Sequence, residues 1–330
     1  MTTVSLVMAT CDKREYLALT LASLTVQTHP DFEVVLCDDG TRGGVADLVD
    51  QYRDRLDLHL VIQENRGRAA ARNAALAQAG GDLVVFIDDD RMADPGFVAA
   101  HVRAAAAGTG VIGWKRRALT WWRPGRLLLG EQDLIRTVVR AGGRDRLAEP
   151  LHLLTPEALT AAPEAALAGV DLGEEPDNHH AVVDEYGPEL EGFRFAWALA
   201  TTANLAVPRA AVEDAGGFDE AYTGWGLEDT DLSYRLHRAG LRFRLEPAAV
   251  NHHQIHPLAG PDPQAAHRVM RAQLMQNLDR FCDRHRTLAA YLYRRRWQGA
   301  LTLPEADRLL ATAETDPLLT RELTALYAEA

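Results

Sequence analysis

The sequence predicts an α/β fold built on a doubly wound, mostly parallel sheet that is flanked by helices. Short apolar runs alternate with segments whose apolar residues recur every three or four positions, which is the pattern of strands followed by helices. From Pro263 onward the pattern is helical alone, which predicts a small C-terminal helical subdomain. Repeated strand-helix units place their strands in parallel and cover both faces of the sheet with helices.

The first strand-helix units follow one another along the chain. Apolar runs predict strands at Val4–Met8, Val34–Cys37, Leu58–Ile62 and 83–87. Helical spacing between these runs is shown by Leu17, Leu21 and Leu24, then by 45–52, and then by an Ala-rich stretch, 69–79, that ends at two glycines. Asp94 and Pro95 offer an N-cap and a first-turn proline for the next helix.

The alternation fades between residues 114 and 199, where we expect an insertion or an acceptor-binding region. The basic stretch Trp114–Arg126 is either a solvated loop, a mobile flap over a diphosphate, or a contact with an anionic or lipid-linked acceptor. A strand pattern returns at 204–207, and the helical tail carries one apolar stripe, Met270, Leu274, Leu278 and Phe281. The predicted divisions of the chain are residues 1–113, 114–199, 200–262 and 263–330.

Composition narrows the class of protein. A net charge of -12, from 35 Lys+Arg against 47 Asp+Glu, argues against nucleic-acid binding through a basic field. Three scattered cysteines are too few for a disulfide framework, so we expect a reducing, cytoplasmic location. No stretch has the roughly 18 uninterrupted apolar residues of a membrane span, which leaves peripheral membrane contact as the remaining option.

Polar residues cluster where the predicted strands end. The clusters are Thr10–Asp12, Asp38–Gly40, Asn65–Gly67 and Asp88–Asp90. In a parallel sheet these carboxyl ends share one edge, and ligands bind in the crevice beyond it. Three adjacent carboxylates are either a solvated acidic turn or a site for a divalent cation such as Mg²⁺ or Mn²⁺, which would remove their mutual repulsion.

Several stretches together resemble one class of enzyme. Asp88-Asp89-Asp90 after a buried strand is similar to the Asp-x-Asp motif of GT-A glycosyltransferases. Residues 4–41 and 65–90 resemble the opening and the following nucleotide-binding half of family 2 glycosyltransferases, and 216–240 resemble the acceptor-side segment of chondroitin-polymerase-like and galactosyltransferase-type enzymes. The resemblance covers most of 1–113 and 200–256 and implies the GT-A fold, with 1–113 as the nucleotide-sugar-binding half and 200–262 as the acceptor and catalytic half. It leaves 114–199 and the tail outside.

The resemblance also implies a nucleotide-sugar donor site with a metal ion. It places Asp39 against the base, Arg72 against the nucleotide or diphosphate, and Asp88 beside the ribose; the full set of donor-site candidates is Thr10, Asp12, Asp39, Arg72, Asp88 and Asp89. Asp90 is the expected metal ligand. A histidine of the sequence AVNHH completes the site, for which we choose His252 over His253 or His256, and an imidazole ligand favours Mn²⁺ over Mg²⁺.

The acceptor side centres on the sequence WGLED. By its match to the family's Glu-Asp pair, Asp229 is the expected catalytic base and Glu228 its acceptor-binding partner, while Trp225 and Gly226 contact the acceptor. The alternatives are that the two acids only stabilise a helix N-terminus and that the tryptophan is part of the core. The expected reaction moves a sugar from a UDP-sugar to a hydroxyl of a carbohydrate, glycolipid or small molecule, with inversion. A retaining transferase of the same fold and a non-catalytic sugar-nucleotide-binding protein are the rivals.

Overall fold

The computed structural model describes residues 3–124, 131–176, 180–257 and 262–328. The first part of the chain alternates strands and helices as predicted: β1 (Val4–Thr10), α1 (Arg14–Leu24), β2 (Phe32–Asp39), α2 (Ala46–Asp50), β3 (Asp57–Gln63), α3 (Arg68–Leu76) and β4 (Leu83–Ile87). Strand β5 (Arg91–Ala93) and helix α4 (Phe97–Ala104) follow. The predicted α/β class is confirmed.

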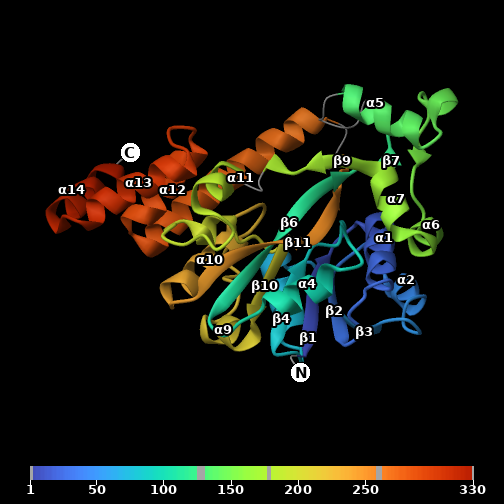
Figure 1. Cartoon of the computed structure of the whole chain (residues 1–330), viewed down its shortest axis with the longest axis horizontal. Coiled ribbons are helices and arrows are strands. Elements are labelled where there is room, and N and C mark those ends of the chain that lie inside the picture. The colour runs from blue at the N-terminus through green and yellow to red at the C-terminus, as the bar shows by residue number, and fades with distance from the viewer. Residues whose placement is uncertain (1–2, 125–130, 177–179, 258–261, 329–330) are drawn as a thin grey trace.

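One large central sheet organises the molecule (Figure 1). Its strand order is β3-β2-β1-β4-β10-β6-β11-β5, and β9 pairs with β6 beside this path. The strands β3, β2, β1 and β4 are parallel, as predicted. Strand β10 (Asn204–Pro208) then runs antiparallel to both β4 and β6 (Thr109–Ala118), whereas β11 (Arg242–Gln254) runs parallel to β6. The sheet is therefore parallel in its N-terminal half and mixed beyond it.

Alternating side chains of the strands build a hydrophobic core on each face of the sheet. Leu6 and Met8 of β1 pack on the face that α1, α2 and α4 cover. Val7 of β1 and Phe86 of β4 pack on the other face, with side chains of α3 and of α10 (Glu228–Arg238). Helix α9 (Arg209–Asp214) and a 3-10 turn at Ala196–Leu199 contribute to the same face. The layers are those of a doubly wound fold.

The segment between β6 and β10 is a set of short elements. They are β7 (Trp121–Trp122), α5 (Glu131–Arg140), a 3-10 turn at Arg144–Arg146, β8 (Leu151–His152), α6 (Pro156–Ala161), α7 (Pro163–Val170), β9 (Asp171–Glu174) and α8 (His180–Tyr186). Of these, β7, α5, α6 and α7 lie together at one end of the molecule (Figure 1), whereas α8 packs against the C-terminal helix α13 (Leu303–Glu314). Strand β6 crosses the predicted boundary at residue 113, so Trp114–Ala118 belongs to the sheet and is neither a loop nor a flap. The C-terminal part of that basic stretch, including Arg126, lies outside the described residues.

Helices end the chain: α11 (Pro263–His285), α12 (Leu288–Trp297), α13 (Leu303–Glu314) and α14 (Pro317–Ala328). Helices α12, α13 and α14 lie at the opposite end of the molecule from α5–α7, and α11 runs toward them across the molecule (Figure 1). Three members of the predicted stripe, Leu274, Leu278 and Phe281, are buried in the core that these helices share with α10. Within the ranges given above, no helix combines the length and the apolar composition that crossing a bilayer requires.

Candidate active site

The carboxyl ends of β1 and β4 meet at one edge of the sheet through a buried hydrogen bond. The Thr10 hydroxyl donates to Asp89 Oδ2 at 2.8 Å, and the Thr20 hydroxyl of α1 donates to the Asp89 backbone carbonyl at 2.8 Å. Burial raises the pKa of Asp89 to about 6, although Lys13 and the hydrogen bond from Thr10 oppose the rise. Thr10 and Asp89, two of the predicted donor-site residues, are thus in contact, and their hydrogen bond holds the acidic turn in place.

Asp90 lies beside two histidines that come from the far end of the sequence. Strand β5 pairs antiparallel with β11, and the Gln254 backbone N–H donates to the Asp90 carbonyl at 2.8 Å. His256 Nε2 is 3.0 Å from Asp90 Oδ2, and His253 Nε2 is 3.8 Å from the same oxygen. One potential ligand atom from each of the three side chains lies within 4.8 Å of the others, which is close enough for a single cation.

His252, the predicted metal ligand, points away from Asp90. Neighbouring side chains of a strand project to opposite faces, so His252 and His253 of β11 cannot both face the acidic turn. The His252 ring instead contacts Asp94, with 2.8 Å between Nε2 and Oδ1, and lies 3.8 Å from Asp171. The structure thus brings His253 and His256, and not His252, beside Asp90, and the role of each histidine as a metal ligand stays a prediction.

A lysine that the sequence did not single out neutralises the acidic turn. Lys13 Nζ lies 2.5 Å from Asp90 Oδ2 and 3.6 Å from Asp89 Oδ1. Although burial alone would raise the pKa of Asp90, Lys13 and the two histidines hold it well below its usual range. The repulsion between Asp89 and Asp90 is thus balanced by a cationic side chain.

The predicted nucleotide-base ligand, Asp39, lies at the end of β2 and is buried. Its Oδ1 accepts hydrogen bonds from Gln63 Nε2 at 2.7 Å and from the Arg66 backbone N–H at 2.8 Å, and its Oδ2 accepts from the Gly67 N–H at 2.9 Å. The carboxylate therefore shapes the loop before α3, and its contact with a base stays a prediction.

Asp12 stands in the loop that follows β1. Its backbone has a φ of 55°, and its carboxylate binds the backbone and side-chain N–H groups of Arg42 at 2.9 and 3.0 Å. The same loop receives support from Thr41, whose hydroxyl accepts from the Asp12 N–H at 3.2 Å. Asp12 therefore joins the loop that follows β1 to the loop that follows β2, at the edge where the sequence predicts the donor site.

Arg72 joins the two halves of the site. Its Nη2 is 2.9 Å from Asp88 Oδ1 at the end of β4, and its Nη1 is 2.8 Å from Glu228 Oε1 at the start of α10. Burial disfavours the charge on this guanidinium, but Asp88 and Glu228 raise its pKa further than burial lowers it. Arg72 and Glu228 are both buried. The predicted contact of Arg72 with the diphosphate stays a prediction, because both terminal nitrogens already bind carboxylates.

The loop before α10 is held in an unusual backbone conformation. Gly226 and Leu227 have positive φ angles of 90° and 74°, and the side-chain amide of Asn277 on α11 donates to the Gly226 carbonyl at 2.8 Å and to the Thr223 carbonyl at 3.1 Å. A left-handed leucine is strained, so such a loop persists only where its surroundings impose it. The half-buried Trp225 packs against the core from this loop.

Asp229 follows Glu228 at the start of α10. Burial and the neighbouring Glu228 carboxylate raise the pKa of Asp229 to about 6, against the opposing effect of Arg72. Its Oδ1 accepts from the Thr230 backbone N–H at 2.7 Å. An aspartate with a pKa near 6 is a better proton acceptor than an ordinary aspartate and is still mostly ionised at neutral pH.

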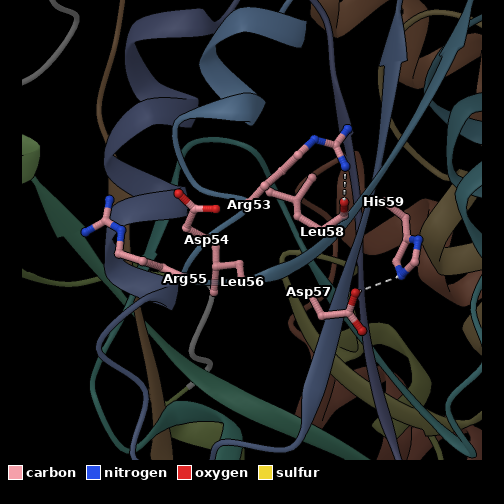
Figure 2. Close-up of a pocket in the computed structure, with 7 residues that line it drawn as sticks. All are labelled: Arg53, Asp54, Arg55, Leu56, Asp57, Leu58 and His59. Carbon is pink, nitrogen blue, oxygen red and sulfur yellow. Dashed lines mark hydrogen bonds and ion pairs between the residues drawn. The ribbon is translucent and has the colours of Figure 1, made fainter.

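A second group of possible metal ligands, Glu33, Asp57 and His59, lies at the other end of the strands. Beside it is an open hollow of about 460 Å³ lined by residues 53–59 (Figure 2). There, Arg53 Nη1 donates to the Leu58 carbonyl at 3.0 Å, and His59 Nε2 is 3.1 Å from Asp57 Oδ1 (Figure 2). Because α/β sheets bind ligands beyond the carboxyl ends of their strands, we place the active site at Asp90 and not at this hollow.

Comparison with known proteins finds two families that match separate parts of the chain. Residues 5–128 match the family described as Glycosyl transferase family 2, and residues 183–256 match the family described as the N-terminal domain of galactosyltransferase. Residues 5–128 are therefore similar to family 2 glycosyltransferases. The first match contains Asp39, Arg72 and Asp90, and the second contains Asp229, His253 and His256.

Curated relatives match most of the length of this chain. They include validoxylamine A glucosyltransferase of Streptomyces hygroscopicus subsp. jinggangensis, 32% identical over 88% of this chain and 62% of that protein. Others are the uncharacterized glycosyltransferase YfnE of Bacillus subtilis, 30% identical over 77% of this chain and 65% of YfnE, and chondroitin synthase of Escherichia coli, 28% identical over 82% of this chain and 38% of the synthase. The chain thus spans less than two thirds of the length of these relatives.

Solved structures confirm the GT-A fold. The mannosyltransferase PcManGT of Pyrobaculum calidifontis superimposes with a TM-score of 0.55 at 20% identity, over 99% of this chain and 84% of that one. Residues 1–349 of TarS from S. aureus superimpose with a TM-score of 0.52 at 16% identity, over 99% of this chain and 90% of that one. The similarity at these identities concerns the fold.

Proposed function

We propose that this glycosyltransferase moves a sugar from a nucleotide-sugar to an acceptor hydroxyl, with a divalent cation held by Asp90, His253 and His256. The observation that carries the proposal is the connection across the site. A possible cation site lies at the end of the acidic turn, and the buried Arg72 links that turn to the carboxylate pair that begins α10. A donor diphosphate and an acceptor can therefore meet between them.

The residues present suit a divalent cation. Asp90 offers a carboxylate oxygen and the two histidines offer imidazole nitrogens, a mixed set that favours Mn²⁺ over Mg²⁺. When bound, such an ion neutralises charge on the diphosphate and on the departing nucleotide. PcManGT is described in complex with GDP-Man and Mn²⁺, which is in keeping with a donor and a cation of these classes.

Asp229 is the proposed general base. The acceptor hydroxyl attacks the anomeric carbon, its proton passes to Asp229, and the bond from that carbon to the diphosphate oxygen breaks as the nucleoside diphosphate leaves. Glu228, fixed by Arg72, holds the start of α10 so that Asp229 faces the acceptor. Attack from the face opposite the leaving group inverts the anomeric configuration, and determination of the product anomer by NMR separates this from retention.

The nucleotide, the acceptor and the location extend the proposal. We retain UDP as the predicted carrier and test it against GDP. A small-molecule acceptor comes first among the predicted acceptors, because the name of the Streptomyces relative specifies such a molecule. A reducing compartment such as the cytosol agrees with the three free thiols, Cys11, Cys37 and Cys282.

Calorimetric titration of UDP and GDP in Mn²⁺, in Mg²⁺ and in EDTA tests the proposal. We expect UDP to bind at least about tenfold more tightly in Mn²⁺ than in EDTA, because the cation offsets the diphosphate charge. Asp90→Asn should abolish the difference. The matched control is Asp57→Asn, in the carboxylate group at the other end of the strands, which should retain it. Equal affinities in Mn²⁺ and EDTA would refute the metal site. Tighter binding of GDP than of UDP would refute only the prediction that UDP is the carrier.

A further inference from the structure

The geometry points to Glu175 as the residue that orients His253 for metal binding. This inference rests on the metal site proposed above. Glu175 Oε1 lies 2.9 Å from His253 Nδ1, while Nε2 of the same ring lies 3.8 Å from Asp90 Oδ2. The imidazole is thus placed between two carboxylates, one at each nitrogen. Glu175 lies outside both family matches, so no comparison gives it a role.

The two nitrogens of a neutral imidazole have different roles, because one carries the proton and the other a lone pair. A carboxylate that accepts the N–H at Nδ1 leaves the lone pair on Nε2, which is the form that can bind a cation beside Asp90. With the proton on Nε2, the ring would donate to Asp90 and could not bind the ion. Glu175 is nearer to the ring than Asp90 is and therefore selects the binding form.

Both carboxylate oxygens of Glu175 contact the guanidinium group of Arg91. Arg91 Nη1 is 3.2 Å from Glu175 Oε1, and Arg91 Nη2 donates to Oε2 at 3.2 Å. Both side chains are less than a tenth exposed. Arg91 follows Asp90 directly and is paired in register with His253 across β5 and β11. The buried Arg91–Glu175 pair therefore lies against the partly exposed ring of His253, next to the acidic turn.

The segment between the two family matches delivers this carboxylate. Strand β9 pairs antiparallel with β6, and the Glu175 N–H donates to the Lys115 carbonyl at 3.0 Å, which continues the pairing to the edge of the site. The preceding residue, Glu174, turns elsewhere: its carboxylate pairs with His180 at 2.7 Å. Two adjacent glutamates therefore differ in whether they contact His253.

Titration of the full chain with Mn²⁺ alone, followed by calorimetry, tests the role of Glu175. We expect Glu175→Gln to weaken Mn²⁺ binding by about 10- to 100-fold, which is the usual effect of removing such a partner of a metal ligand. Glu174→Gln is the matched control and should bind as the wild type does. Adding Glu175→Gln to His253→Ala should cause no further loss, because Glu175 acts through that ring.

The outcomes separate this inference from the proposed function. Loss of Mn²⁺ binding in Asp90→Asn with normal binding in Glu175→Gln would refute the role of Glu175 alone. Unchanged binding in Asp90→Asn would refute the metal site and the inference with it. If Glu175→Gln weakens binding equally in the His253→Ala background, Glu175 does not act through the histidine.

A measurement on the wild-type chain keeps the test independent of how well the variant folds. Histidine-selective ¹⁵N NMR of the metal-free protein, with the His253 signals assigned by their loss in His253→Asn, reports which nitrogen carries the proton. We expect Nδ1 to be protonated in the neutral ring. Protonation at Nε2 would overturn the inference, because Glu175 would then not be accepting the ring's proton.

Discussion

Replacing Asp229 by asparagine should abolish sugar transfer and at the same time stabilise the folded protein. The amide has nearly the same shape but cannot accept the acceptor's proton, so turnover should fall by about 10²- to 10⁴-fold, the usual contribution of a general base. The pKa of Asp229 is raised from 3.8 to about 6 by burial and by Glu228. Between the ordinary pKa of 3.8 and the folded-state pKa of about 6, the unfolded chain releases the proton before the folded one does, so folding loses stability as the pH rises. At pH 7 the ionised side chain therefore disfavours the fold.

The shift sets the size of the gain in stability. A rise of about 2 pKa units corresponds to at most about 3 kcal/mol at pH 7, and partial solvation of the half-buried side chain lowers the expected gain to about 1 to 2 kcal/mol. Thermal unfolding at pH 7 measures it. The gain should shrink as the pH falls below about 6 and disappear near about pH 2 to 3, where the wild-type carboxyl is protonated in both the folded and the unfolded state.

The neighbouring glutamate is the control, since Glu228→Gln takes the charged partner from buried Arg72 and should lower the melting temperature. If Asp229 only stabilises the positive end of α10, its replacement would instead cost about 0.3 to 1 kcal/mol and leave turnover nearly normal. A lower melting temperature together with normal turnover in Asp229→Asn would refute the assignment.

Two further outcomes follow from the charges in the site. With a base whose pKa is about 6, kcat/KM should rise with pH through about 6 and level off above it, because only the carboxylate accepts a proton; a flat profile from pH 5 to 8 would count against Asp229. Lys13→Met should melt at a lower temperature than the wild type in EDTA, and Mn²⁺ should raise its melting temperature by more, since Lys13 balances Asp89 and Asp90 in the absence of an ion. Arg42→Met, which removes an exposed ion pair, is the control. If Mn²⁺ raises the melting temperatures of Lys13→Met and the wild type equally, Lys13 does not compete with the cation.

Much of the site could be predicted from the sequence, because the end of a strand is visible in the local pattern of apolar and polar residues. The apolar run 83–87 predicts both the strand β4 and the place where it stops, and parallel pairing then brings Asp39 and Asp88 to the same edge without further information. The Glu228-Asp229 pair was found by resemblance, and the structure places it across Arg72 from Asp88. The positions of Asp39 and Asp88 follow from where their own strands end, whereas the contact across Arg72 does not.

The histidines show where local pattern fails. His252 and His253 are adjacent in a strand, so their sequence says that one faces the acidic turn but not which one. His256 is three residues from His253, a spacing that in an extended strand would put it on the other face; it returns to Asp90 because β11 ends at Gln254 and the chain turns there. The pairing of β11 with β5, set by residues far apart in the chain, decides both positions.

By itself the sequence determined the α/β class, the order of the first strands and helices, and the acidic edge of the sheet, because side-chain periodicity and strand ends are local properties. The tertiary structure alone decided that Lys13 balances the acidic turn, that Arg72 joins Asp88 to Glu228, and that Glu175 meets His253. Their partners are 77, 16, 156 and 78 residues away in the chain. Such contacts arise only when strands and helices have packed, since an ionised side chain that is buried on folding must find a charge brought to it by a different element.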